Sequence, residues 1–239
     1  MNLWSAEDSP EIVQLVLWRH GQTTFNAERR FQGHTDVPLN EIGLRQAEQA
    51  APYLAALRPD AIFSSDLSRA ASTAAVLGRL TGLPVQLDKD LRERGGGSWE
   101  GLTAAEIRAE FPEAYAAWAP PDGESAESVA DRASMAMERI ADSPVLAGGG
   151  MAVVVGHGGA LSLGASRLLG IPDDLRVIGS FGNCRWSVIS RRLGRWRLIE
   201  HNVGVLPEPV LATVPASDPG VDSGLDSGLA SDVDAERED

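Results

Sequence analysis

The strongest constraint on the fold is an alternation of short apolar runs with longer stretches of helical periodicity. The runs are too short to be helices of their own and are rich in β-branched and aliphatic residues. They lie at residues 13–18, 61–63 and 151–155, with a further short strand expected at 84–87. Such runs are typical of strands covered on both faces. The sequence therefore predicts an α/β fold, a doubly wound and mostly parallel sheet with helices on both faces.

Helix signals follow the first two runs, and a hairpin signal ends the pattern. Asn40 is the predicted N-cap of one helix, and Ser64, Ser65 and Asp66 are expected to cap the next. The expected inner faces consist of Leu44, Ala47, Ala51 and Leu54 in the first helix and Leu67, Ala70, Ala74, Leu77 and Leu80 in the second. Residues 184–191 and 195–201 flank a Leu193-Gly194 turn and predict a hairpin at the sheet edge.

Domain organisation is expected to be simple. An N-terminal extension covers residues 1–12, a single folded domain covers 13–206, and a helical insert at about 103–143 is expected to cap the site. The tail at 207–239 is rich in proline and then acidic, with eight acidic residues against one arginine from Asp218 onward. Because it cannot bury enough apolar surface to order itself, we expect it to be disordered.

Charge and composition exclude several classes of partner. The net charge of −13 argues against nucleic acid and against an anionic membrane surface. No apolar run approaches the length of a membrane span, and the acidic N-terminus lacks the features of a signal peptide. Because Cys184 is the sole cysteine, no intramolecular disulfide can form. We expect Cys184 to be a packed strand residue. A cytoplasmic protein is expected, and the oligomeric state stays open, a homodimer included.

The triplet Arg19-His20-Gly21 falls where the first predicted strand ends. Ligands of α/β sheets collect outside the carboxyl ends of strands. A neutral imidazole can attack phosphorus, a guanidinium can hold phosphoryl oxygens, and glycine lets the backbone approach a ligand closely. Taken alone, however, the triplet favours a strand that ends in a surface histidine.

Three further groups strengthen the phosphate interpretation. Arg69 falls in the first turn of a predicted helix, and His157 lies between a strand end and a helix start. Cations are unfavourable at both places unless an anion is bound there. Glu93 follows the third predicted strand and could protonate a leaving alkoxide if its surroundings kept it protonated. We expect Glu100, Glu106 and Glu110 to be solvated and His34 and His201 to be structural or solvent-facing.

The ordered set of motifs resembles the phosphoglycerate-mutase-like branch of the histidine phosphatase superfamily, from about residue 13 to 206. The motifs are Arg19-His20-Gly21-Gln22-Thr23, Asn26, Gln32-Gly33-x-x-Asp36-x-Pro38-Leu39, Gly43-x-x-Gln46-Ala47, Ser64-Ser65-Asp66-Leu67-x-Arg69-Ala70, Leu91-Arg92-Glu93, Gly97-x-Trp99-Glu100-Gly101 and Gly156-His157-Gly158-Gly159.

This resemblance implies a fold, an activity and a set of roles. His20 would be phosphorylated, Arg19, Arg69 and His157 would hold the phosphoryl oxygens, and Glu93 would donate a proton. Three further positions, Asn26, Gln32 and Gly33, match positions near bound substrate. The reaction implied is hydrolysis of a small phosphorylated metabolite without metal or other cofactor.

The substrate can be narrowed by the same resemblance. Mutases of the branch carry basic residues in the helical insert, and residues 111–125 contain no Lys or Arg, which favours a phosphatase. The pattern at 91–101 and 183–187 is similar to that of actinobacterial phosphatases of glucosyl-3-phosphoglycerate, so we expect a phosphoglycerate or sugar-phosphate derivative. That substrate bears a carboxylate, and the loose cations near the site are Arg29, Arg30 and Arg94.

Two other classes stay open at this point. The first is a nucleotide-binding oxidoreductase, suggested by the glycines around His157, although Leu161 interrupts the G-x-G-x-x-G pattern. The second is a catalytically silent module that uses the acidic tail to bind a partner. Binding alone does not demand a nucleophile and an acid together, which favours the enzyme.

Overall fold

The computed structural model describes residues 11–172, 175 and 177–205. The chain divides into two units at Val205 and Leu206. The first unit contains all described elements, whereas the tail predicted to be disordered lies outside the described residues. Most of the predicted N-terminal extension also lies outside them, and its last residue, Ile12, begins the first strand.

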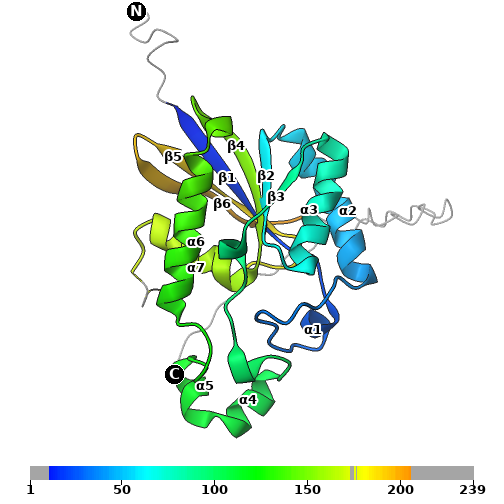
Figure 1. Ribbon diagram of the computed structural model, residues 1–239, viewed down its shortest axis with the longest axis vertical. Helices are drawn as coiled ribbons and strands as arrows, with labels where there is room; N and C mark the ends of the chain where they lie inside the picture. Colours follow the sequence, from blue (N-terminus) through cyan, green and yellow to red (C-terminus); the bar gives the residue numbers. More distant parts are fainter. Residues whose placement is uncertain (1–10, 173–174, 176, 206–239) are drawn as a thin grey trace, which may run out of the picture. The chain divides into compact units, whose positions relative to one another are not determined.

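Six strands form one sheet in the order β3-β2-β4-β1-β5-β6 (Figure 1). Their bounds are β1 Ile12–Arg19, β2 Ala61–Ser64, β3 Val85–Leu87, β4 Gly150–Gly156, β5 Trp186–Arg192 and β6 Arg195–Val203. Neighbours among β3, β2, β4 and β1 are parallel, whereas β5 is antiparallel to β1 and β6 to β5. The predicted sheet and its terminal hairpin are therefore confirmed.

Helices cover both faces of this sheet. The α-helices are α1 Thr24–Ala27, α2 Glu41–Ala56, α3 Ser68–Thr81, α4 Ala104–Glu110, α5 Pro112–Ala117, α6 Ala126–Ala141 and α7 Gly158–Leu168. Leu15 and Leu17 of β1 belong to the core under α6 and α7, and Val16 and Trp18 to the core under α2 and α3. This alternation is what a strand with two buried faces requires.

Two details of the predicted helices are wrong. Asn40 caps α2 as predicted, but Leu44 and Leu80 are exposed, at 44% and 56%. The inner face of α2 includes the predicted Ala47, Ala51 and Leu54, and Gly43 and Ala50 complete it. Small residues let the helix lie close to the chain: a Cβ at Gly43 would come within 2.0 Å of the Gln22 carbonyl oxygen. In α3 the N-cap is Leu67, without a side-chain cap.

The predicted helical insert at about 103–143 does not form one structure. Helix α6 is part of the layer on the sheet, because Ala136, Met137 and Ile140 are core residues. Of the helices in residues 103–143, α4 and α5 lie outside the layers, at the end of the domain toward which β1 runs (Figure 1). Trp118, which ends α5, contacts Trp99 edge-on at 5.3 Å and anchors this segment.

Candidate active site

The parallel strands bring the predicted groups together at the carboxyl ends of the central strands β1 and β4. Arg19 at the end of β1 pairs with Gly156 at the end of β4. The His20 N–H donates to the Gly156 carbonyl at 3.0 Å, so His20 and His157 follow neighbouring strands. The centroids of their two rings are 5.1 Å apart.

His20 is buried in a form suited to nucleophilic attack. Its Nδ1 lies 2.7 Å from the Gly21 carbonyl oxygen. Since a carbonyl can only accept, Nδ1 carries the hydrogen and Nε2 keeps a free lone pair. Burial, followed by the charges of Arg19 and Arg69, lowers the pKa of His20 well below 6.5. The imidazole is therefore neutral at physiological pH.

Arg19 presents an unpaired donor next to this histidine. Its Nη1 donates to the Phe181 carbonyl, whereas its buried Nε has no hydrogen-bond partner among the described residues. A buried donor without a partner costs about 1–3 kcal/mol. The charge of Glu93 only partly offsets the burial that lowers the pKa of Arg19. A phosphoryl oxygen would satisfy both the donor and the charge.

Arg69 is fully buried in the first turn of α3, as predicted. Its Nη2 donates to the Gly33 carbonyl at 2.8 Å and its Nη1 to the Thr35 carbonyl at 2.9 Å. Its Nε donates to His157 Nδ1 at 3.3 Å. Burial lowers its pKa to about 10, so it stays charged near neutral pH. A second guanidinium is thus fixed beside the two histidines.

His157 has partners in the protein on both ring nitrogens. Nδ1 accepts from Arg69, so Nε2 carries the hydrogen and donates to Ser65 Oγ at 2.9 Å. Burial, then Arg69 and His20, lowers the pKa of His157 well below 6.5. Ser65, which sequence reasoning treated as a helix cap, instead holds this ring. A phosphoryl oxygen would have to compete with Ser65 Oγ for the hydrogen on His157 Nε2.

The two buried histidines predict how stability depends on pH. In the unfolded chain each has a pKa near 6.5 and binds a proton below it, whereas the folded chain resists protonation. Stability is therefore complete above pH 6.5 and falls as pH drops from 6.5 toward the lowered folded-state pKa values. The slope reaches about 1.4 kcal/mol per pH unit for each histidine.

This slope can be measured by urea unfolding between pH 7.5 and 5. Carboxylates whose pKa is lowered on folding, such as Glu100, add to the slope of stability against pH mainly below this window. His157→Asn should reduce the slope by about half. A free energy of unfolding that stays constant down to pH 5 would contradict the buried neutral state of these rings.

Glu93 reaches the site from the loop that follows the 3-10 helix η2 (Lys89–Leu91). Its carboxylate accepts from the backbone N–H groups of Arg94, Gly159 and Ala160 at 2.8–3.0 Å, the last two at the start of α7. A Cβ at Gly159 would come within 2.6 Å of Glu93 Oε1, so glycine permits this approach. The carboxylate also interacts electrostatically with Arg19 and Arg69. The Glu93 carboxylate is the acceptor in all three hydrogen bonds, so its role as a proton donor stays a prediction.

The remaining predicted positions, Asn26, Gln32 and Gly33, are held by hydrogen bonds to Thr23, Asn183 and Arg69. Gln32 Oε1 accepts from Thr23 Oγ1 at 2.9 Å, and Gly33 provides the carbonyl that Arg69 binds. Asn26 Oδ1 accepts from Asn183 Nδ2, which also donates to the His20 carbonyl, both at 3.1 Å. Sequence reasoning had not singled out this role of Asn183, because it depends on a contact between residues 163 positions apart.

Several expectations about nearby charges are wrong. Arg94 is not loose: it is 8% exposed and donates to the Glu124 and Trp118 carbonyls. Arg30 forms ion pairs with Glu28 and Glu106. Glu100 is not solvated either, since it accepts from the backbone N–H groups of His34, Thr35 and Gly96. Arg94 and Glu100 therefore hold loops in place through hydrogen bonds to backbone groups.

The other histidines and the cysteine are engaged in packing. His34 Nε2 lies 2.8 Å from the Glu93 carbonyl oxygen, and His201 Nδ1 lies 3.0 Å from Ser187 Oγ. Cys184 is buried just before β5, and burial raises its pKa to about 12, so the thiol is inert. In the described part of the chain, no group of three or more His, Cys, Asp or Glu side chains could hold a metal ion. No helix there is long and apolar enough to span a membrane.

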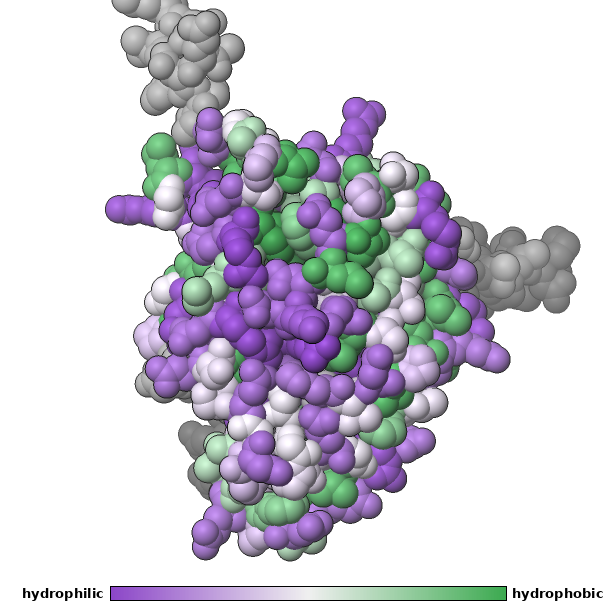
Figure 2. Space-filling view, viewed as in Figure 1, coloured by the Kyte–Doolittle hydropathy of each residue, from purple (hydrophilic) through white to green (hydrophobic). Residues whose placement is uncertain are grey.

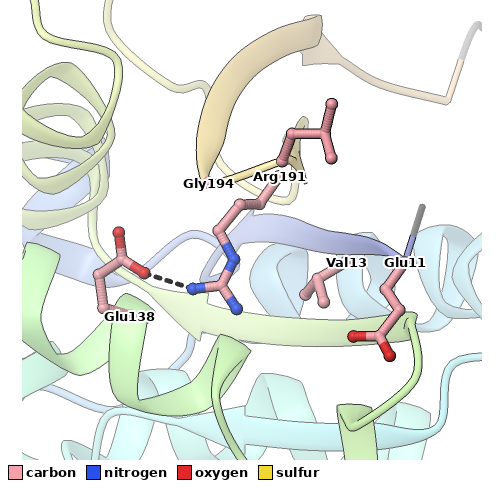
Figure 3. Close-up of a pocket in the computed structure, with 6 residues that line it drawn as sticks. Glu11, Val13, Glu138, Arg191 and Gly194 are labelled. Atoms are coloured by element: carbon pink, nitrogen blue, oxygen red, sulfur yellow. Dashed lines mark hydrogen bonds and ion pairs between the residues drawn. The ribbon is translucent and has the colours of Figure 1, made fainter.

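A hollow of about 600 Å³ lies near the opposite end of β1 (Figure 3). It is lined by Val13 at the start of the strand, roughly 20 Å from Arg19 at 3.3 Å per residue. Its cation, Arg191, is already bound by Glu138, Asp142 and the Ala141 carbonyl. This saturation contrasts with the unpaired Nε of Arg19, so the hollow offers no comparable phosphate site.

Comparisons with known proteins agree with this geometry. The family model of the histidine phosphatase superfamily (branch 1) matches residues 15–204. The chain belongs to the histidine phosphatase superfamily. The predictions of family, fold and phosphatase class are confirmed, and a nucleotide-binding oxidoreductase is ruled out.

Individual relatives and solved structures are similar to this histidine phosphatase over most of its length. Glucosyl-3-phosphoglycerate phosphatase of Mycolicibacterium vanbaalenii is 42% identical over 193 residues, which cover 73% of this chain and 83% of the relative. The metal-independent phosphoserine phosphatase of Arabidopsis thaliana is 41% identical over 161 residues, covering 63% and 66%. The structure of a mycobacterial glucosyl-3-phosphoglycerate phosphatase with VO3 has a TM-score of 0.74 at 39% identity, covering 80% of this chain and 100% of that one.

Proposed function

We propose that this histidine phosphatase is a metal-independent phosphomonoesterase that works through a phosphohistidine at His20. One observation carries the proposal: the hydrogen bond from His20 Nδ1 to Gly21 leaves the buried, neutral ring with a lone pair on Nε2. The same hydrogen bond would stabilise the positive charge that the ring acquires on phosphorylation.

The reaction then has two steps. In the first, His20 Nε2 bonds to phosphorus while the bond to the ester oxygen breaks, and the leaving oxygen takes a proton from Glu93. In the second, a water oxygen bonds to phosphorus, the nitrogen–phosphorus bond breaks, and the proton of water returns to Glu93. The sum of the steps is alcohol and inorganic phosphate.

The charges around His20 make a metal unnecessary for these steps. Arg19 and Arg69 bring two guanidiniums to a buried site, where electrostatic interactions are strong. We propose that the unpaired Nε of Arg19 binds one phosphoryl oxygen, and that Arg69 and His157 bind the others. Asn26, Gln32 and Gly33 would form the adjoining wall of the substrate site.

The proposed substrate is a phosphoglycerate or sugar-phosphate derivative such as glucosyl-3-phosphoglycerate. Support comes from the relatives of that name and from residues 111–125, which contain no Lys or Arg to grip a mutase substrate. Residues 13–206 would form the catalytic domain. A cytoplasmic location and a homodimer stay predictions.

Phosphate release with excess chelator tests this proposal. The panel contains glucosyl-3-phosphoglycerate, 3-phosphoglycerate, phosphoserine and p-nitrophenyl phosphate. We expect chelator to leave the rates unchanged and glucosyl-3-phosphoglycerate to have the highest kcat/KM. Preference for phosphoserine would overturn the substrate alone. Conversion of 3-phosphoglycerate to its 2-isomer faster than hydrolysis would favour a mutase, and no turnover of any compound would favour a silent binding module.

A further inference from the structure

Figure 2 shows hydrophilic side chains gathered over the middle of one face. In α6, Arg139 pairs with Asp88 and Asp90 of the loop that leads to Glu93, and Arg132 pairs with Glu124. Arg132 of α6 is the most enclosed cation of these pairs, with 17% of its side chain exposed. Its Nη1 donates to the carbonyls of Asp90 and Arg92 at 2.9 and 2.6 Å, and its Nη2 to that of Glu93 at 2.9 Å. One guanidinium therefore binds the backbone up to and including Glu93.

Glu124 holds the chain on the other side of Glu93. Its Oε2 accepts from the Gly95 N–H at 2.8 Å, and its own N–H donates to the Gly95 carbonyl at 2.9 Å. Its carbonyl accepts from Arg94 Nε. A Cβ at Gly123 would come within 2.5 Å of the Gly95 carbonyl, so the two segments lie in direct backbone contact.

The two side chains form one unit. Glu124 Oε1 and Oε2 lie 2.8 and 2.7 Å from Nε and Nη2 of Arg132, which is the bidentate arrangement of a strong ion pair. In the described part of the chain, neither group forms a hydrogen bond with Arg19, His20, Arg69 or His157, although the charge of Arg132 acts on His157 from a distance. Removing one member would leave the other partly buried without its partner and would free the loop.

We propose that Arg132 and Glu124 are positioning residues that clamp the backbone on both sides of Glu93 and so fix its carboxyl group at the start of α7. Through Glu124 the clamp also ties the Glu93 loop to the segment that follows α5. The inference rests on the proposed proton-donor role of Glu93. Because proton transfer requires hydrogen-bond geometry, a small displacement of the carboxyl group slows the step that uses it.

Leaving-group dependence is the signature of such a role. An alkoxide is strongly basic and needs a proton as it leaves, whereas p-nitrophenolate leaves with little help. We expect Glu124→Gln to lower kcat/KM for an alkyl phosphate about 10-fold and kcat/KM for p-nitrophenyl phosphate less than 3-fold. We compare kcat/KM because it reports the first step alone, whereas kcat also contains the second step, in which Glu93 takes a proton from water for either substrate. Arg132→Lys keeps the charge but loses the fork and should show the same pattern.

Arg139→Gln is the matched control. Arg139 lies on the same helix and pairs with Asp88 and Asp90 of the same loop, but in the described structure it has no contact with Glu93. We expect it to leave both rates unchanged. The aryl substrate serves as an internal reference in each preparation, so partial unfolding lowers both rates equally and is recognised as such.

Glu93→Gln separates failure of the inference from failure of the proposed function. If Glu93→Gln shows no leaving-group dependence, the proton-donor role itself is wrong. If it does, Glu124→Gln in that background should add no further dependence, because it acts through Glu93. Equal losses on both substrates, or additive losses in the double variant, would overturn the clamp.

Discussion

Replacing His20 by asparagine should abolish turnover, with a loss on the order of 10⁴-fold or more in kcat. The amide can still donate to the Gly21 carbonyl but has no nucleophilic lone pair at the position of Nε2. Phosphate release measures the loss. Rapid acid-free quenching during turnover should trap an acid-labile phosphoenzyme in the wild type and none in the variant.

His201→Asn is the control for this experiment. His201 is hydrogen-bonded to Ser187 Oγ and its ring packs edge-on against Phe181. In the described residues it forms no hydrogen bond with His20, Arg69 or His157. We expect its kcat to stay within about 3-fold of wild type. Retention of more than a few per cent of activity by His20→Asn, or an undiminished phosphoenzyme signal, would show that another group is the nucleophile.

The sequence predicted the place where His20 lies because that place depends on local patterns. Residues 13–18 and 151–155 are apolar throughout, and only buried parallel strands suit both runs and the helices between them. Once β1 and β4 are parallel neighbours, the residues that follow them, His20 and His157, must meet. Arg69 follows from the same reasoning applied to β2 and α3.

The errors arise where a polar side chain had two local interpretations. Ser65 precedes a helix and was expected to cap it, but its hydroxyl binds His157, 92 positions away in the chain. Glu100 and Arg94 look like surface charges in sequence, yet each bonds to the backbone of another loop. Hydropathy patterns carry no information about such partners, because they record which residues are buried and not what they bind.

The prediction that residues 103–143 form one insert over the site is wrong for a related reason. The apolar stripe of α6 predicts a helix correctly, but the same stripe fits a cap over a site and a layer on a sheet. Contacts of Met137 and Ile140 with the sheet core decide for the layer. The clamp formed by Arg132 was invisible for the same reason, since its partners are backbone carbonyls 39–42 positions away.

Arg69→Lys should be the most damaging conservative change at the site, with a loss of about 100- to 1000-fold in kcat/KM. A lysine keeps one charge, but a single ammonium cannot reproduce the directions in which Arg69 now reaches Gly33, Thr35 and His157. Loss of the contact to His157 Nδ1 also frees that ring to turn. Vanadate mimics the five-coordinate phosphorus of the transition state, so its affinity should fall more than the affinity for inorganic phosphate.

Arg79→Lys controls for the substitution itself, since Arg79 is exposed in the last turn of the same helix. It should leave kcat/KM and vanadate inhibition unchanged. If Arg69→Lys weakens vanadate and phosphate equally, Arg69 binds the ground state as well as it binds the transition state. If it lowers the free energy of unfolding while the folded fraction keeps full kcat/KM, the guanidinium serves only to hold Gly33 and Thr35, and Arg19 with His157 must stabilise the phosphoryl group alone.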